Sequence, residues 1–295
     1  QPATPSVAKK FRHISALRDG FKGVTSVRSF QLAFAAAFIT TLCEVVFMAR
    51  FASSARYALT ESLAAGSINS FRATTLIGHL AWAGVLGYVG YLVYHYALAH
   101  IIYRTSRIID RRATTEVQAR RAALGSLASM FTVDALTWVF GFITLVLVIG
   151  ANVGFLGTKS LGVVGQILAI LTNAIVAYVW LGLLAARHMA TYAIVLGQVN
   201  VRQAYTTGWT LYNRQFGRLT AGLIVATLVG FVVALPASII SNIAGNSLIG
   251  LSISVLVVGL AQAVILIVGA VYFLRLYRFI IAREYDSELG HLLSG

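Results

Sequence analysis

One carboxylate stands inside a long apolar run and is the side chain of this sequence best placed to do chemistry in a membrane. Glu44 lies within FITTLCEVVFMARF. An ionised carboxylate at the centre of a bilayer costs about 2.5 to 3.5 kcal/mol, so it needs a proton, a cation or a hydrogen-bonding partner. Glu44 is therefore either a proton or cation site, or a structural partner of another helix or of Arg50. Its place near the outer end of the run favours the structural interpretation.

A second acid, Asp134, lies near the inner end of another apolar run. Its expected depth matches that of Arg104 or Arg120, so we expect a structural salt bridge there and no catalytic role. Glu44 and Asp134 are the two intramembrane polar candidates. No metal site is expected, because the remaining acids do not cluster.

Histidine and tyrosine recur with helical spacing in YVGYLVYHYALAHIIY, which contains His95 and His100. Spacings of three, four and seven residues place these side chains in two stripes along a helix. A haem or quinone pocket is one interpretation, with His100 and His188 as the only pair at one expected depth. The favoured interpretation is that these side chains anchor a helix end at the membrane interface, with no cofactor.

These residues are carried by apolar segments that we predict to be membrane helices. The chain has 295 residues, of which 58% are hydrophobic and only 11% are charged, and its mean hydropathy is +0.82. Soluble domains average about a quarter charged residues, so a water-soluble globule is excluded. Each segment can cross about 30 Å of hydrocarbon as a helix, and none shows the alternation of membrane strands. We predict an all-α fold with six spans, at 30–52, 75–101, 130–156, 161–186, 219–241 and 248–274.

The basic residues are distributed unevenly between the two sides of this topology. With six spans, 19 of the 23 Lys and Arg residues fall on the side that holds both termini, and 4 fall on the other. Lys and Arg are retained on the side where a membrane protein is synthesised. Both termini are therefore predicted to lie inside, in a bacterial cytoplasmic membrane or in a mitochondrial or other organelle inner membrane. The same bias explains the net charge of +14 without nucleic acid.

The segments outside the spans are predicted to lie at the membrane interface. Residues 1–29 form a basic start, 30–286 the transmembrane domain and 287–295 a short tail. The basic start fits either a bacterial cytoplasmic flank or an organelle protein whose transit peptide was removed. Interfacial helices are expected near 53–74, 104–128 and 187–218. The charged segment 104–128 should extend the second span, and 187–218 should form an amphipathic helix pair with Trp209 and Tyr212 at headgroup level.

A group of arginines just after the second span predicts contact with anionic lipid headgroups or an acidic partner. Each Lys or Arg near an anionic surface contributes about 1 kcal/mol. The alternative is a solvated helix neutralised by Asp110 and Glu116. The predicted headgroup site consists of Arg104, Arg107, Arg111 and Arg112, with Tyr103 where a headgroup would meet hydrocarbon.

Small residues repeat at spacings that allow membrane helices to approach closely. This pattern predicts tight packing within the bundle or between subunits, and no chemistry. The positions are Gly84, Gly87, Gly90, Gly150, Gly154, Gly222, Ala226 and Gly230.

Sequence motifs of the common enzyme classes are absent. The sequence contains no G-x-x-x-x-G-K-[ST], H-E-x-x-H or G-x-S-x-G, and its single cysteine, Cys43, excludes a disulfide framework. We therefore do not expect an enzyme.

The last third of the chain contains LLAARHMATYAIVLGQVNVRQAYTTGWTLYNRQFGRLTAGLI, and its final apolar run ends with VYFLRLYRFII. With these segments the last 110 residues resemble the six-helix bacterial inner-membrane proteins of the YciC type. The chain departs from that pattern at Pro236 and in the long basic start. The resemblance implies six spans and no defined activity.

The sequence thus favours a non-catalytic membrane protein, an accessory, structural or assembly subunit of a larger membrane complex that acts through helix packing and lipid contact. Its expected partners are anionic lipids and other membrane subunits. The second hypothesis is a small-solute or proton-coupled transporter that uses Glu44. The third is a haem or quinone carrier that uses the histidines of the second span.

Overall fold

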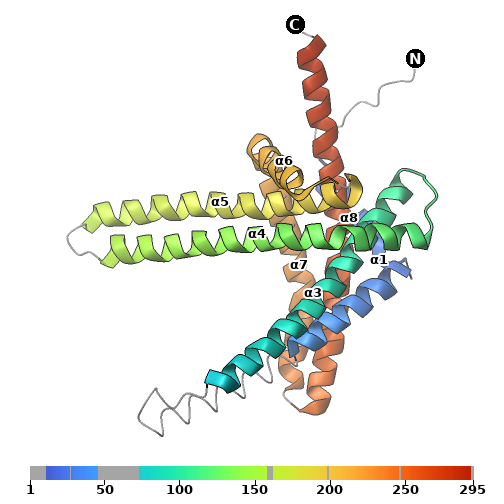
Figure 1. The fold of residues 1–295 in the computed structure, drawn as a ribbon, viewed down its shortest axis with the longest axis horizontal. Coiled ribbons are helices and arrows are strands. Elements are labelled where there is room, and N and C mark those ends of the chain that lie inside the picture. Colours follow the sequence, from blue (N-terminus) through green and yellow to red (C-terminus); the bar gives the residue numbers. More distant parts are fainter. Residues whose placement is uncertain are drawn as a thin grey trace. The chain divides into compact units, whose positions relative to one another are not determined.

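The described part of the chain folds into helices, as Figure 1 shows. The computed structural model describes residues 11–26, 28–45, 73–157, 162–197, 199–245 and 247–293. These residues contain no strand, so the all-α prediction is confirmed for them. The helices are α1 (His13–Val24), Arg28–Val45, α3 (Ala73–Ile109), α4 (Glu116–Gly157), α5 (Gly162–Gly197), α6 (Val201–Arg214), α7 (Phe216–Ala244) and α8 (Leu248–Leu293).

Five of the described helices are long and apolar enough to cross a membrane. They are α4, α5 and α7 and the apolar parts of α3 and α8. The number becomes six if α1 and the helix Arg28–Val45, which are bent by 86° at a short break, count as one span. The predicted interfacial segment 53–74 lies almost wholly outside the described residues. The predicted tail 287–295 is helical as far as Leu293, where α8 ends.

The described chain divides into two compact units. Unit 1 contains Gln1–Ala16, Ile102–Thr227 and Tyr272–Gly295, and unit 2 contains Leu17–Ile101 and Leu228–Val271. The helices α3, α7 and α8 each contribute residues to both.

In unit 1, α4 and α5 lie side by side and antiparallel (Figure 1). Asn152 and Asn173 exchange two amide hydrogen bonds of 3.0 and 3.1 Å between these helices. The Trp180 ring lies against Gly141, where a Cβ atom would clash with it. Most of the surrounding leucine, isoleucine and valine side chains are exposed. The pair is therefore held by a few specific contacts and presents an apolar surface.

The short helix α6 folds back along the second half of α5. It begins at Asn200, whose side-chain oxygen accepts a hydrogen bond of 2.8 Å from the Gln203 backbone. Its buried side, which includes Gly208 and Tyr212, packs against α5. The segment 187–218 thus contains the end of α5, the separate helix α6 and the start of α7. Its position at the membrane interface stays a prediction.

Tyr212 is buried within unit 1, and its headgroup level in a membrane stays a prediction. Its side chain is fully buried, and its hydroxyl donates to the Tyr178 carbonyl at 2.9 Å. Trp209 and Tyr212 both pack over Gly182, the position where α5 leaves room for rings. An aromatic side chain on an amphipathic helix can lie at the membrane surface or pack inside the protein. The sequence does not distinguish these two positions.

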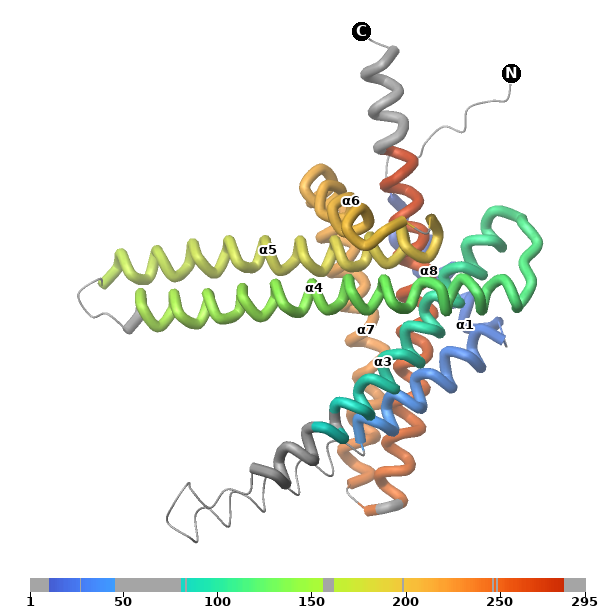
Figure 2. Tube along the Cα trace, viewed as in Figure 1, coloured from blue at the N-terminus to red at the C-terminus, as the bar shows by residue number. Residues whose placement is uncertain are grey.

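A sharp turn separates α3 from α4, and Figure 2 traces the chain through it. The Arg111 amide donates to the Ile108 carbonyl at 3.0 Å, and the Arg112 amide donates to the Arg107 carbonyl at 2.9 Å. This is the Schellman pattern of a helix end, in which glycine usually occupies the left-handed position. Here that position is Arg111, with φ of 54°, at a cost of about 1 to 2 kcal/mol. The expected continuous extension of the second span is therefore wrong, because the charged residues from Glu116 onward begin α4.

Unit 2 is held together by small side chains and a few polar bonds. Ala33, Ala36 and Ala37 on the helix Arg28–Val45 are buried, and Phe38 of this helix packs against Gly259 of α8. On α3, Gly90 lies close to the Thr40 backbone. Small residues at these crossings let the helices approach closely, as in other membrane bundles.

We predict that Gly208→Ala destabilises the protein. The added Cβ would lie 2.6 Å from the backbone oxygen of Ala186, so α6 and α5 would have to separate. Overpacking of this kind costs about 1 to 3 kcal/mol of unfolding free energy. Unfolding in detergent, followed by circular dichroism, provides the measurement.

Gly217→Ala is the matched control, because a Cβ at this helical glycine meets nothing within 4 Å. It should leave stability unchanged or raise it by up to about 1 kcal/mol through helix propensity. Equal stability of the two variants would contradict the close α5–α6 packing.

Candidate functional site

Unit 2 contains a cavity of about 430 Å³ that is open on one side. Its walls come from the helix Arg28–Val45, from α3 and from α8. The lining residues are Thr40, Glu44, Gly87, Gly90, Tyr91, Tyr94, His95, Gln262 and Ile265. The volume falls within the range of small-molecule sites, about 300 to 1,000 Å³.

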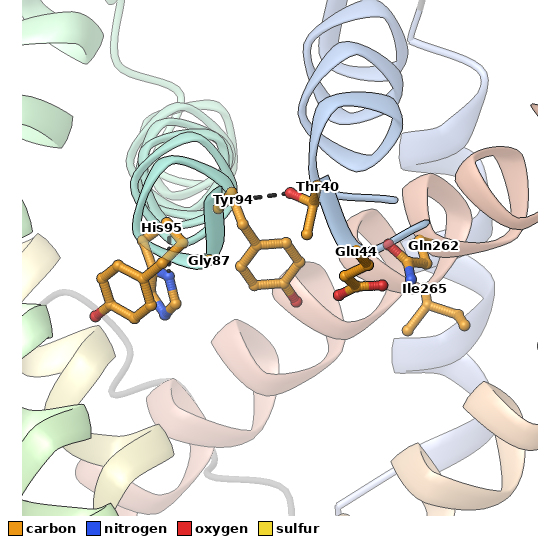
Figure 3. Close-up of a pocket in the computed structure, with 9 residues that line it drawn as sticks. Thr40, Glu44, Gly87, Tyr94, His95, Gln262 and Ile265 are labelled. Atoms are coloured by element: carbon orange, nitrogen blue, oxygen red, sulfur yellow. Dashed lines mark hydrogen bonds between the residues drawn. The ribbon is translucent and has the colours of Figure 1, made fainter. Parts of the chain in front are cut away.

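The carboxylate of Glu44 is the one acidic group among these lining residues. Figure 3 shows it between the ring of Tyr94 and the side chain of Gln262. Its side chain is exposed, and it makes no hydrogen bond or ion pair with the described part of the chain. The structural helix partner considered for Glu44 is thus not found in the described residues, and Arg50, the other partner considered, lies outside them.

Two threonines on the helix Arg28–Val45, which carries Glu44, form hydrogen bonds to the other two helices that line the cavity. The Thr40 hydroxyl donates to the Ala36 carbonyl at 2.9 Å and approaches the Gly90 carbonyl of α3 at 3.2 Å. The Thr41 hydroxyl donates to Oε1 of Gln262 at 3.2 Å, which leaves the amide N–H groups of Gln262 for other partners. Glu44 therefore projects from a helix that is bonded to both α3 and α8.

The imidazole of His95 is held by a hydrogen bond within its own helix. Its Nδ1 lies 2.9 Å from the carbonyl oxygen of Tyr91. A carbonyl oxygen only accepts, so Nδ1 carries a proton and donates it to this oxygen. The ring stacks on Tyr91 at 3.9 Å between centroids and meets Tyr94 edge-on at 5.3 Å. The cavity thus combines a carboxylate, an imidazole and two tyrosine rings.

This arrangement suits a positively charged or hydrogen-bonding ligand. The carboxylate attracts a cation or takes up a proton, and the faces of tyrosine rings attract cations as well. Within the described residues, no group of three or more His, Cys, Asp or Glu side chains is arranged to hold a metal ion. Binding of a small cation or polar solute is the chemistry that these side chains provide.

Sequence reasoning singled out Glu44 and His95 but missed their neighbours Thr40, Tyr94 and Gln262. Thr40 and Glu44 are separated by four residues and so share one helix face. Gln262 is an isolated amide in the apolar run VLVVGLAQAVILIV. Both signals are visible in the sequence, but only the fold brings them to one cavity.

Asp134 lies in unit 1 and pairs with Arg187. The Nε and Nη2 atoms of Arg187 donate to the two carboxylate oxygens at 2.5 and 3.0 Å. The expected partners, Arg104 and Arg120, are therefore corrected to Arg187. The physical reason is the antiparallel α4–α5 hairpin, which brings Asp134 of α4 to the level of Arg187 of α5.

The two histidines of the proposed haem pair belong to different units. His100 is buried in unit 2, where its ring lies near Tyr96. His188 belongs to unit 1 and stacks on Phe273 at 4.4 Å between centroids. Both rings already have aromatic neighbours in their own unit, so the haem or quinone hypothesis gains no support.

Most of the predicted packing glycines do not lie at helix crossings in the described structure. A Cβ at Gly84, Gly87, Gly150, Gly154 or Gly230 would meet nothing within 4 Å. Gly222 lies against Leu276, and Gly90 lies against Thr40. Spacing alone predicts a small-residue row but not which face another helix covers. Ala226, also in this set, is only partly buried.

No family model, curated protein or solved structure matches this chain. The resemblance to YciC-type proteins therefore stays a prediction.

We predict that Asp134→Asn destabilises the protein by about 1.5 to 3 kcal/mol, because a carboxylate that is only 6% exposed loses the charge that strengthens its hydrogen bonds from Arg187. The apolar double variant Asp134→Leu/Arg187→Met should recover most of the loss. Chemical denaturation in detergent measures both effects.

Asp110→Asn is the matched control. Asp110 also pairs with an arginine, Arg278, at 2.7 Å, but its side chain is 36% exposed. Exposed pairs contribute about 0 to 1 kcal/mol. If Asp134→Asn proves no more costly than Asp110→Asn, the Asp134–Arg187 pair is not a structural contact of the core.

Proposed function

We propose that this chain is a non-catalytic multi-pass membrane protein that binds a small cation or polar solute in the Glu44 cavity and moves it, or a proton, across the bilayer. The observation that carries the proposal is the cavity itself, whose lining combines a carboxylate, an imidazole and two tyrosine rings within apolar helices. This was the second hypothesis from the sequence, and the clustering of polar groups around Glu44 now favours it.

The energetic argument rests on the charge of Glu44. An ionised carboxylate in hydrocarbon is costly unless it is paired or hydrated. No cation of the described residues approaches Glu44 closely enough to pair with it. A proton or an external cation would remove that cost, and uptake and release of such a partner constitute a binding cycle.

The proposed membrane arrangement has six spans, with both termini on the cytoplasmic or matrix side. It is supported by the excess of Lys and Arg on that side, 19 against 4. The membrane would be a bacterial cytoplasmic membrane or an organelle inner membrane.

A second candidate function is that of an accessory or assembly subunit. The most apolar stretches of α5 and α7 are only 17% and 11% buried within the chain. Such surfaces fit lipid or the helices of a partner subunit, and the Asn152–Asn173 pair would keep α4 and α5 together during assembly. A large assembly that co-migrates in mild detergent favours this candidate, and a discrete monomer or dimer favours the transporter.

We predict that narrowing the cavity blocks transport. Gly84 and Gly87 both lie on α3 with open space beyond a Cβ, but only Gly87 lines the cavity. Gly87→Leu should therefore abolish uptake, and Gly84→Leu should preserve it. The assay uses proteoliposomes with an imposed membrane potential, guanidinium, choline and Na⁺ as probe cations, and an internal pH dye to detect proton entry.

Glu44→Gln tests the carboxylate in the same assay. It retains the shape of the side chain but loses the charge, so uptake should fall tenfold or more, as expected for loss of a charged hydrogen bond worth about 1.5 to 3 kcal/mol. The proposal is wrong if the protein moves neither protons nor any probe cation faster than empty vesicles. It is equally wrong if the two glycine variants behave alike.

We predict opposite labelling at the two ends of the spans. In a background with Cys43→Ala, Ile243→Cys lies near the end of α7 at a position that is 80% exposed, and Thr115→Cys lies in the turn before α4. An impermeant maleimide should reach the first in intact cells and the second only after permeabilisation. Equal labelling of both from outside would exclude the six-span arrangement.

A further inference from the structure

The end of α3 holds an arginine in a backbone conformation that favours glycine. Arg111 has φ of 54° in the turn that closes the helix. Glycine would occupy this position without strain. A residue held in a strained backbone conformation suggests a function for its side chain if a second observation supports that function. The second observation is the charge around it.

Several arginines lie around the turn that closes α3, whereas Asp110 is the one acidic residue in it. Arg278 donates to both oxygens of Asp110, at 2.7 and 2.9 Å, and to the Ser106 hydroxyl at 2.6 Å. This contact, with charges from Arg112 and Arg107, holds the pKa of Asp110 below its usual value, so Asp110 stays ionised at neutral pH. One arginine thus satisfies the one acid of the turn.

Three of the remaining arginines keep their side-chain donors for another partner, and Arg107 keeps part of its own. Arg107 donates to the Tyr103 hydroxyl at 3.1 Å, and its guanidinium lies 5.1 Å from the centroid of that ring. Arg104, Arg111 and Arg112 donate no side-chain hydrogen bond to the described part of the chain. Guanidinium groups bind phosphate oxygens through paired N–H donors, which suits a phosphate ester.

The position of the group on α3 identifies the source of the phosphate. Arg104 and Arg107 lie within the last two turns of the apolar stretch Gly84–Ile109. Ile108, in the same turn as Arg107, is 63% exposed. An exposed apolar side chain beside guanidinium groups fits the level where acyl chains give way to headgroups.

We propose that Arg104, Arg107, Arg111 and Arg112 form a binding site for the phosphate group of an anionic phospholipid. Tyr103 holds Arg107 in place, and Asp110 with Arg278 fixes the turn from which Arg111 and Arg112 project. The site lies in unit 1 and is independent of the Glu44 cavity in unit 2. The proposed phospholipid site therefore stands even if the transport proposal fails.

Arg111→Gly separates the role of the side chain from that of the backbone. Glycine relieves the left-handed strain, so the variant should melt at a temperature equal to or higher than that of the wild type. Its affinity for phosphatidylglycerol should nevertheless fall about fivefold, the effect expected for one arginine at an anionic surface. Native mass spectrometry of the delipidated protein titrated with phosphatidylglycerol measures the affinity, and phosphatidylcholine measures lipid binding without net charge.

Arg121→Gln is the matched control, since it removes one exposed positive charge from α4 in the same unit. It should leave the affinity for phosphatidylglycerol unchanged. An equal loss in both variants would mean general surface charge and would overturn the site. A lower melting temperature for Arg111→Gly would overturn the strain argument. Displacement of the lipid by an equal concentration of inorganic phosphate would assign the site to free phosphate and reject the lipid.

Discussion

A peptide group that leaves water for hydrocarbon must find its hydrogen-bond partner within the protein, and this requirement organises the described chain. A helix satisfies the requirement within one segment, so apolar segments of the length seen in α4, α5 and α7 fold as helices whatever packs beside them. The backbone N–H and C=O groups that lack a partner within their own helix lie at the helix ends. Asn200 caps the start of α6, and the Arg111 turn closes α3, so the polar ends are satisfied by local bonds.

Helix formation leaves the question of which helices meet, because apolar side chains have no preference for one another over lipid. In the described units, helices meet where a glycine on one helix lies against an aromatic ring or the backbone of the other. Gly182 receives Trp209 and Tyr212, Gly141 receives Trp180, and Gly208 lies on the backbone at Ala186. These are steric fits between particular pairs. A small residue without a matching ring, such as Gly150, faces open space.

Charged side chains add a further constraint, because each needs an oppositely charged partner or water. Asp134 and Arg187 satisfy each other within the α4–α5 hairpin, and Asp110 and Arg278 do the same beside the α3 turn. Glu44 differs, because its carboxylate opens onto a cavity and meets no partner among the described residues. The two proposals arise from this contrast. They concern the groups whose charges the described fold leaves available, a carboxylate in unit 2 and several guanidinium groups in unit 1.

The sequence by itself determined the helical class and the approximate positions of the long apolar segments, and it singled out Glu44 as a carboxylate in an apolar run, because hydropathy and charge are properties of single segments. It also indicated that the arginines after the second span form one group. Tertiary structure alone decided that Arg187, and neither Arg104 nor Arg120, pairs with Asp134, and that Tyr212 is buried. It also brought Gln262 into one cavity with Glu44 and His95. These outcomes depend on which faces of separate helices meet and at what level, and that is set by steric fit and hairpin register, which no single segment encodes.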